Sequence, residues 1–182
     1  LNGYFGDFDF VSGLYWFNED GSNRQGADSR FNAGPNLLAL EQEATSRAVF
    51  VNLGYNLTDD LRVAGGVRYN KDKKSAIADV GIGPFAASDE WSQMSYDFSA
   101  SYRLENGMNV YGSIQSGYQS GQFPARPYCL FGNPECLVAT DNITAVNYEM
   151  GIKGQVTDTF SMSIAVFNTV FDDLPYQVST TA

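Results

Sequence analysis

The chain has 182 residues, the size of one ordinary domain, and its 11 basic and 21 acidic residues give a formal net charge of −10. This charge argues against a nucleic-acid surface, because such surfaces need many lysines and arginines to neutralise phosphates. There is no histidine, which excludes histidine-dependent nucleophiles and histidine-ligated metal sites. Charged residues are sparse at 18% and aromatic residues reach 14%, and no apolar stretch is long enough for a spanning helix. The composition fits a β-sandwich or a membrane β-barrel.

Apolar and polar residues alternate along the chain with the two-residue period of a half-buried strand. Between positions 93 and 104, the even-numbered residues from Met94 to Leu104 are all apolar and the odd-numbered ones are all polar. In a second strand we expect Val49 and Leu53 on the face opposite Arg47. About seven strands are predicted, each near the 9–11 residues that cross a bilayer when tilted. In chain order they are 5–17, 47–57, 61–70, 93–104, 108–116, 146–156 and 159–170.

The connections between these strands alternate in length. Short turns are predicted at 58–60, 105–107 and 157–158, where Thr, Asp, Asn and Gly supply favourable turn chemistry. Long connections are predicted at 18–44, 72–90 and 119–142, which are rich in Gly, Pro, Asn and Asp. Short turns at one end and long loops at the other are typical of an outer-membrane barrel with extracellular long loops. The same alternation also occurs in a soluble sandwich, but the regular change in connection length favours the barrel.

Charged side chains fall on the non-apolar face of the predicted strands, as a wet barrel lumen would require. Four of them are candidate lumenal charges: Arg68, Arg103, Glu149 and Lys153. Glu149 and Lys153 are four residues apart on one face, and we expect them near Arg68 or Arg103 on neighbouring strands. An ion-pair ladder that fixes the barrel register or holds a plug is the expected role.

Two cysteines, Cys129 and Cys136, lie close together in the Pro- and Gly-rich stretch between the fifth and sixth predicted strands. A disulfide that stiffens an extracellular loop is expected, worth about 2–3 kcal/mol through loop closure. A metal or redox role would need further ligands nearby, and the sequence offers none. No metal site and no cofactor is therefore predicted.

Eight short stretches of the chain form a recognisable series. They are SRAVF (46–50), YNLTD (55–59), LRVAGGVRY (61–69), YGS (111–113), SGYQSGQF (116–123), NYEMGIK (147–153), AVF (165–167) and FDDL (171–174). Together they resemble the barrel of TonB-dependent outer-membrane receptors. Their order and spacing, rather than any single piece, carry the resemblance, which spans about residues 44–177.

The resemblance implies a barrel of 22 strands closed by an N-terminal plug domain. It also implies uptake of a scarce ligand, most often a ferric siderophore, driven by a TonB-type energy-coupling protein of the inner membrane. The partners would be outer-membrane lipid, that coupling protein and the small ligand, and no nucleic acid. Residues 1–182 then represent part of one barrel domain without the plug and the remaining strands, so we expect an internal piece of a longer chain in the bacterial outer membrane.

Three residues of the cysteine-containing loop are candidates for contact with an anionic or aromatic ligand: Arg126, Tyr128 and Phe131. Ordinary loop packing explains the same residues. An alternative function is a small non-transporting barrel or a surface binding module. A complete small barrel predicts an even strand count and a C-terminal aromatic residue, and the sequence predicts neither. An outer-membrane enzyme is disfavoured because such barrels usually carry a histidine-dependent nucleophile, so no catalytic residue is predicted.

Overall fold

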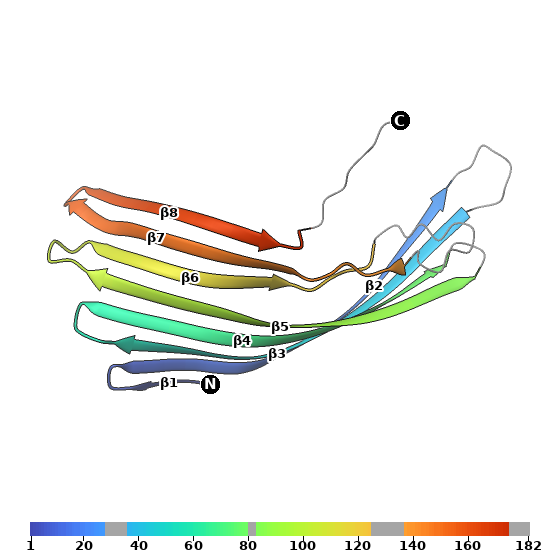
Figure 1. Cartoon of the computed structure of the whole chain (residues 1–182), viewed down its shortest axis with the longest axis horizontal. Helices are drawn as coiled ribbons and strands as arrows, with labels where there is room; N and C mark the ends of the chain where they lie inside the picture. Colours follow the sequence, from blue (N-terminus) through green and yellow to red (C-terminus); the bar gives the residue numbers. More distant parts are fainter. Residues whose placement is uncertain (28–35, 80–82, 125–136, 175–182) are drawn as a thin grey trace.

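A computed structural model describes residues 1–27, 36–79, 83–124 and 137–174. They form one antiparallel sheet in which the strands follow one another in sequence order (Figure 1). The strands are β1 (Asn2–Phe5), β2 (Phe8–Ala27), β3 (Asn36–Asn56), β4 (Leu61–Asp79), β5 (Pro84–Arg103), β6 (Asn109–Gln119), β7 (Ile143–Thr157) and β8 (Phe160–Asp172). Within these ranges no helix has the length and hydropathy needed to cross a membrane.

The described residues contain eight strands, where about seven were predicted. The additional strand is β1, a short N-terminal partner of β2. The sequence prediction began its first strand at residue 5 and therefore did not include β1. The turn between β1 and β2 contains Gly6, whose φ of 62° is easily adopted only by glycine, so the chain reverses two residues before the long strand begins.

The strands are longer than predicted, and two of the predicted long connections are wrong in extent. β2 continues to Ala27 and β3 begins at Asn36, while β4 continues to Asp79 and β5 begins at Pro84. At about 3.4 Å per residue, the 20 residues of β2 span roughly 65 Å, well beyond an apolar band about 25 Å tall. Half of each long strand therefore lies outside the membrane. The third predicted connection remains, because β6 ends at Gln119 and β7 begins at Ile143.

The predicted short turns are confirmed, and they lie together at one end of the sheet, at the left of Figure 1. In the turn after β3, the Thr58 hydroxyl accepts hydrogen bonds from the backbone N–H groups of Asp60 and Leu61 at 3.3 and 2.9 Å. In the turn after β5, Asn106 Oδ1 accepts from the Met108 N–H at 3.1 Å, and Gly107 has a φ of 79°. Side-chain acceptors and one glycine thus set the strand register at this end.

Directly paired residues lie on the same side of a sheet, so the register defines two faces. The outer face carries a continuous apolar band at the short-turn end of the strands. Its members are Phe10, Leu14, Val49, Val51, Leu53, Tyr55, Leu61, Val63, Val67, Tyr69, Met94, Tyr96, Phe98, Tyr102, Val110, Ile114, Tyr148, Met150, Ile152, Ile164 and Val166. Many are exposed, among them Val166 at 68% and Met94 at 61%. Such a wide exposed apolar surface needs lipid to cover it.

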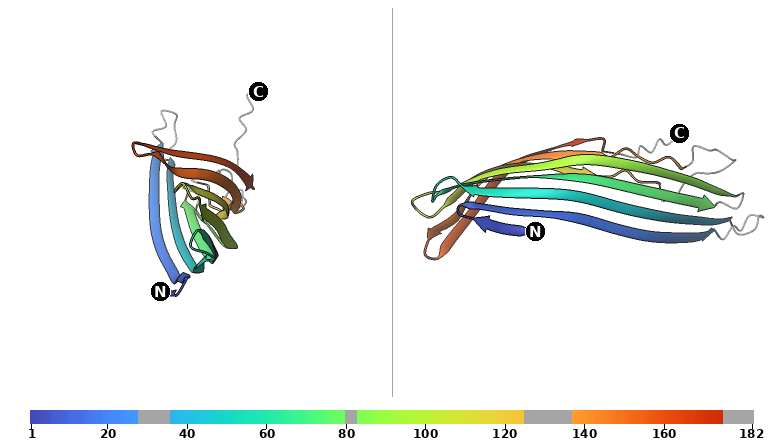
Figure 2. Two further views of the ribbon diagram at one scale, coloured as in Figure 1. Left: turned by 90° about the vertical axis from the view of Figure 1, so that its left-hand side faces the viewer. Right: turned by 90° about the horizontal axis from the view of Figure 1, so that it is seen from below.

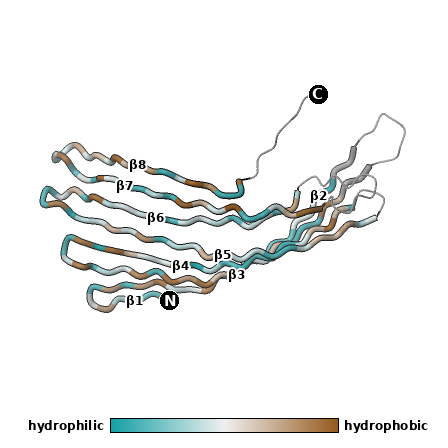
Figure 3. Tube along the Cα trace, viewed as in Figure 1, coloured by the Kyte–Doolittle hydropathy of each residue, from teal (hydrophilic) through white to brown (hydrophobic). Residues whose placement is uncertain are grey.

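The inner face carries polar residues at the same heights, such as Asn52 beside Gly66 and Asp97. Above the band the apolar pattern breaks off. On β4, residues 70–75 are polar on both faces. Beyond them Ile77 lies on the outer face, and Ala76 and Ala78 on the inner face are almost fully buried. Figure 3 shows the change of hydropathy along these strands. This break explains the missed strand ends, because a run of polar residues offers no apolar alternation to follow.

Arg47 is a further correction. It is directly paired with Lys71 and lies two residues from Val49, so it shares the outer face with the apolar band instead of lying opposite it. Because side chains alternate with a period of two, positions 47 and 49 must point the same way. Arg47 therefore stands at the upper border of the band.

The described sheet does not close into a barrel. β1 and β8 are its edges, and each has one neighbour in the described part of the chain. Figure 2 shows the sheet twisted and bent across its width, as the wall of a larger barrel would be. A complete small barrel is thus not what these strands form. Open strand edges are not stable in lipid, so further strands must pair with both edges in the membrane.

Candidate functional site: the inner wall above the apolar band

The two ends of the long connection between β6 and β7 fold over the inner face of other strands. Phe123 and Leu137 are each 6% exposed and pack in one buried cluster with Leu40, Ala76 and Ala78 of β3 and β4. Phe85 and Ala87 of β5, together with Ala139, line the same cluster. The connection therefore leaves the sheet between β6 and β7 but is anchored on β3–β5. These two ends cover part of the inner wall above the band.

The two ends are also joined to each other. The Gln122 N–H donates to Thr140 Oγ1 at 3.1 Å, and the Thr140 N–H donates to the Gln122 carbonyl at 3.0 Å. We name residues 119–124 and 137–142 the loop stem. Because its two ends are hydrogen-bonded and packed on one wall, the stem fixes the start and the end of the connection that contains the cysteines.

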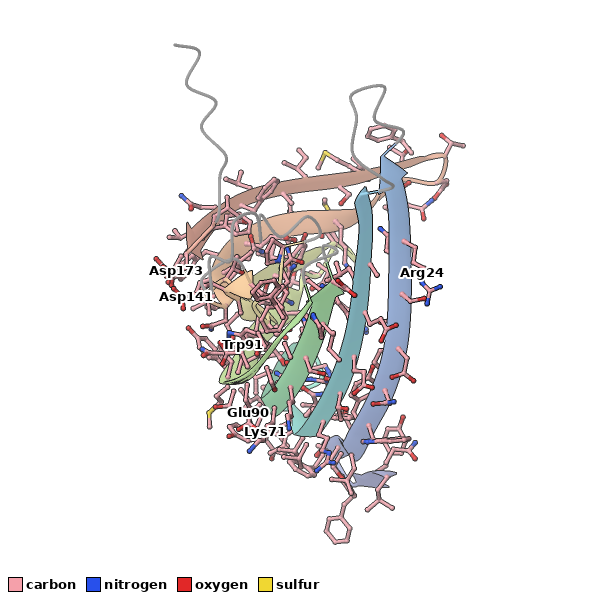
Figure 4. The ribbon with its side chains drawn as sticks, turned by 90° about the vertical axis from the view of Figure 1, so that its right-hand side faces the viewer. Arg24, Lys71, Glu90, Trp91, Asp141 and Asp173 are labelled. Carbon is pink, nitrogen blue, oxygen red and sulfur yellow. The ribbon has the colours of Figure 1, made fainter. Side chains whose placement is uncertain are left out.

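Lys74 and Trp91 contact the stem at Gly121. Lys74 Nζ donates to the Gly121 carbonyl at 2.8 Å and lies 5.8 Å from the centre of the Trp91 ring. Burial lowers the pKa of Lys74, while the nearby carboxylates of Asp72 and Glu19 act in the opposite direction. Figure 4 shows Trp91 within this crowded interior. Lys74 therefore serves the stem as a hydrogen-bond donor and is not a free cation for a ligand.

Only glycine fits at position 121, because the backbone there lies close to the Trp91 ring and to the Thr140 carbonyl oxygen. A Cβ atom there would meet the Trp91 ring at 2.6 Å and would also collide with the Thr140 carbonyl oxygen. One obstacle is backbone and the other is a side chain that is 8% exposed, so neither can yield easily. The glycine belongs to the family-like stretch SGYQSGQF, but nothing in the sequence reveals its neighbours.

The structure places all four candidate lumenal charges on the inner face, but it does not bring them together. Glu149 accepts a hydrogen bond from the Tyr111 hydroxyl at 2.8 Å, and Lys153 Nζ lies 5.3 Å from the centre of the Tyr111 ring. Arg68 is three strands away on β4, where it donates to Asn70 at 2.6 Å and covers the Tyr15 ring at 5.1 Å. Arg103, at the end of β5, is paired with Asn109.

Sequence reasoning missed one ion pair on the inner face. Arg62 of β4 binds Asp9 of β2 at 2.7 Å, reaching across the intervening strand β3 at Gly54. A Cβ at position 54 would collide with the Arg62 guanidinium. A glycine between two charged strands is the sequence signal of this pair, but it is visible only once the register is known.

We expect Tyr111→Phe to lower the free energy of unfolding in lipid vesicles by about 1 kcal/mol. The variant loses a hydrogen bond to a carboxylate but keeps the ring next to Lys153. Urea titration followed by tryptophan fluorescence measures the change. The control is Tyr148→Phe, which removes a hydroxyl from the outer face of the neighbouring strand β7 and should change little. Equal losses in both variants would contradict the proposed contact.

The remaining candidates lie outside the described residues. They are Arg126, Tyr128, Cys129, Phe131 and Cys136. The stem on either side of them is described, and it begins and ends on the inner wall. A loop that contacts a ligand inside the barrel mouth would need such a placement.

Comparison with known proteins identifies the family and the individual proteins that this chain is similar to. The sequence matches the family model "TonB dependent receptor-like, beta-barrel" over residues 1–182. It is 29% identical over 178 residues to the pesticin receptor of Yersinia enterocolitica, covering 91% of this chain and 24% of that protein. The chain thus spans about a quarter of the length of this relative.

Solved structures show the same fold. The ferric yersiniabactin uptake receptor FyuA from Yersinia pestis superposes with a TM-score of 0.80 at 24% identity, covering 94% of this chain and 27% of that one. The ferric-catecholate import receptor Fiu from E. coli K12 gives a TM-score of 0.67 at 17% identity, with 92% and 29% covered. The alcaligin outer-membrane receptor FauA from Bordetella pertussis gives 0.57 at 13% identity, with 95% and 32% covered.

Proposed function

Because the chain belongs to the family of TonB-dependent receptor β-barrels, proteins of the bacterial outer membrane, we propose that it forms part of a receptor for energy-coupled uptake of a ferric siderophore. The chain would contribute barrel wall and part of the extracellular vestibule to that receptor. A TonB-type protein of the inner membrane would supply energy through a plug domain elsewhere in the complete receptor.

The loop stem is the observation that carries this proposal. A barrel that served only as an anchor would have no need for a long connection whose two ends pack on its inner wall. Here Phe123 and Leu137 secure the stem on the inner wall, so that in the complete receptor it would present the connection to an incoming ligand. Loops in such positions commonly carry binding function on a rigid scaffold.

The relatives support a ferric siderophore as the ligand class. FyuA is named for uptake of ferric yersiniabactin and Fiu for import of ferric catecholates. Ferric siderophore complexes are compact and often anionic, so an arginine and aromatic residues would suit them. We therefore assign the ligand contacts to Arg126, Tyr128 and Phe131, with a disulfide between Cys129 and Cys136 that limits the conformations of the loop.

Deleting the gene tests the function. We expect the deletion strain to lose uptake of radiolabelled iron with at least one siderophore from a panel of catecholates, hydroxamates and mixed phenolates. Uptake through the receptor should also stop when the TonB protein is absent. Unchanged uptake of every ferric complex in the panel would overturn the proposal.

Arg126→Gln should weaken binding of that siderophore by roughly tenfold or more, because a charge-assisted hydrogen bond is lost. Isothermal titration or fluorescence quenching with the purified receptor measures the dissociation constant. Arg24→Gln is the control, since Arg24 lies on the outer face of β2. Equal affinity of the two arginine variants would remove Arg126 from the site.

The proposed disulfide between Cys129 and Cys136 is tested separately. Mass spectrometry after alkylation without reductant should find both cysteines unmodified.

A further inference from the structure

A row of three cations borders the apolar band on the outer face. Arg47 and Lys71 are directly paired across β3 and β4, and Lys73 follows two residues later on the same face. All three side chains are exposed. Like charges directly opposite each other destabilise a sheet, so this arrangement requires a compensating anion.

The protein supplies only part of that compensation. Glu90 of β5 is directly paired with Lys73 in the register, but its carboxylate binds Lys71 at 2.8 Å, and Figure 4 shows Glu90 and Lys71 next to each other. Glu43 and Asp20 stand opposite each other one step further from the band, beyond Thr45. In the described part of the chain, neither Arg47 nor Lys73 forms an ion pair within 4.0 Å. Two exposed cations thus remain available to an external anion.

The position of the row fits a lipid headgroup. One step below it, the outer face carries Leu14, Val49 and Tyr69, the uppermost members of the band. Trp16 is directly paired with Arg47 and is 69% exposed. Tryptophan at a membrane border lies at headgroup level. Acyl chains lying against the band would therefore bring their headgroup to the three cations.

We propose that Arg47, Lys71 and Lys73 bind a phosphate of a phosphorylated glycolipid in the outer leaflet of the outer membrane. The row lies on the long-connection side of the band, which is the extracellular side. The arginine guanidinium holds a phosphate through two parallel hydrogen bonds, and the lysines add charge. Glu90 competes with the phosphate for Lys71. This site is distinct from the proposed siderophore path, because it lies on the opposite face of the sheet.

The test measures retention of lipid A by the complete detergent-purified receptor, using native mass spectrometry with added lipid A. We expect Arg47→Gln and Lys73→Gln each to weaken retention about fivefold. Glu90→Gln should strengthen it, because the competing carboxylate is removed. Arg24→Gln is the matched control, since it removes one cation from the outer face far above the band and should leave retention unchanged.

Lipid A without its phosphates should bind all variants equally weakly. Millimolar inorganic phosphate should not displace lipid A from the wild-type receptor, because the acyl chains contribute to binding. Equal retention by all four variants would overturn the proposal. Displacement by inorganic phosphate would overturn it as well, because it would indicate a general anion site. Heat-modified gel mobility verifies that each variant is folded, and a gain for Glu90→Gln cannot arise from misfolding.

Discussion

Ile114→Arg is expected to lower the free energy of unfolding in lipid vesicles by about 2–4 kcal/mol, the cost of arginine near the bilayer midplane. Ile114 lies midway up the apolar band, paired with Phe98 on one side and Tyr148 on the other. An arginine there has no lumen to enter, because its strand position points to lipid. Urea titration of the complete receptor in vesicles measures the loss.

Gln115→Arg is the matched control one residue further along β6. Gln115 faces inward and is paired with Asp97 and Asn147, so a new arginine gains a carboxylate neighbour and polar surroundings. We expect its effect to stay below about 1 kcal/mol. Similar losses in the two variants would contradict the assignment of the faces.

Gly121→Ala is the second change with a large expected effect. The added methyl group meets Trp91 and the Thr140 carbonyl, and overpacking of this kind costs about 1–3 kcal/mol. We expect the stem to detach from the inner wall, with siderophore affinity reduced roughly tenfold and faster proteolytic cleavage between Phe123 and Leu137. Titration with the ferric complex and timed limited proteolysis measure the two effects.

Gly21→Ala controls for the loss of a glycine. Gly21 lies on β2, at the height of Gln42 and Ala76, and a Cβ at this position meets nothing within 4 Å. It should leave both affinity and cleavage unchanged. If Gly121→Ala also behaves like the wild type, the loop stem is not a fixed part of the vestibule.

The strand pattern within the apolar band was predictable because one face meets lipid and the other meets polar surroundings. The alternation from Met94 to Tyr102 follows directly from this, and the short turns were predictable from their Thr, Asp, Asn and Gly residues. The upper strand ends were not predictable by the same rule. There residues 70–75 of β4 are polar on both faces, so the strand continues without an apolar alternation that would reveal it.

The candidate site was predictable only in part. A period of two suffices to assign Arg68 and Glu149 to the inner face, but their neighbours depend on the relative position of β4 and β7, with β5 and β6 between them. The loop stem depends on contacts between residues far apart in sequence, such as Phe123 with Ala76. No local pattern encodes such contacts, because each partner is an ordinary apolar residue in its own segment.

Spin labels placed one at a time along β4 test the position of the membrane on this wall most directly, in a receptor whose native cysteines are replaced by serine. We expect high oxygen accessibility at the outward positions Leu61, Val63, Val67 and Tyr69, and low values at the inward positions between them. On the outer face from Lys71 upward, a water-soluble nickel reagent should relax the spin labels more strongly than oxygen does. Oxygen accessibility that does not alternate, or that continues undiminished to Ile77, would contradict a lipid-covered band that ends below Lys71.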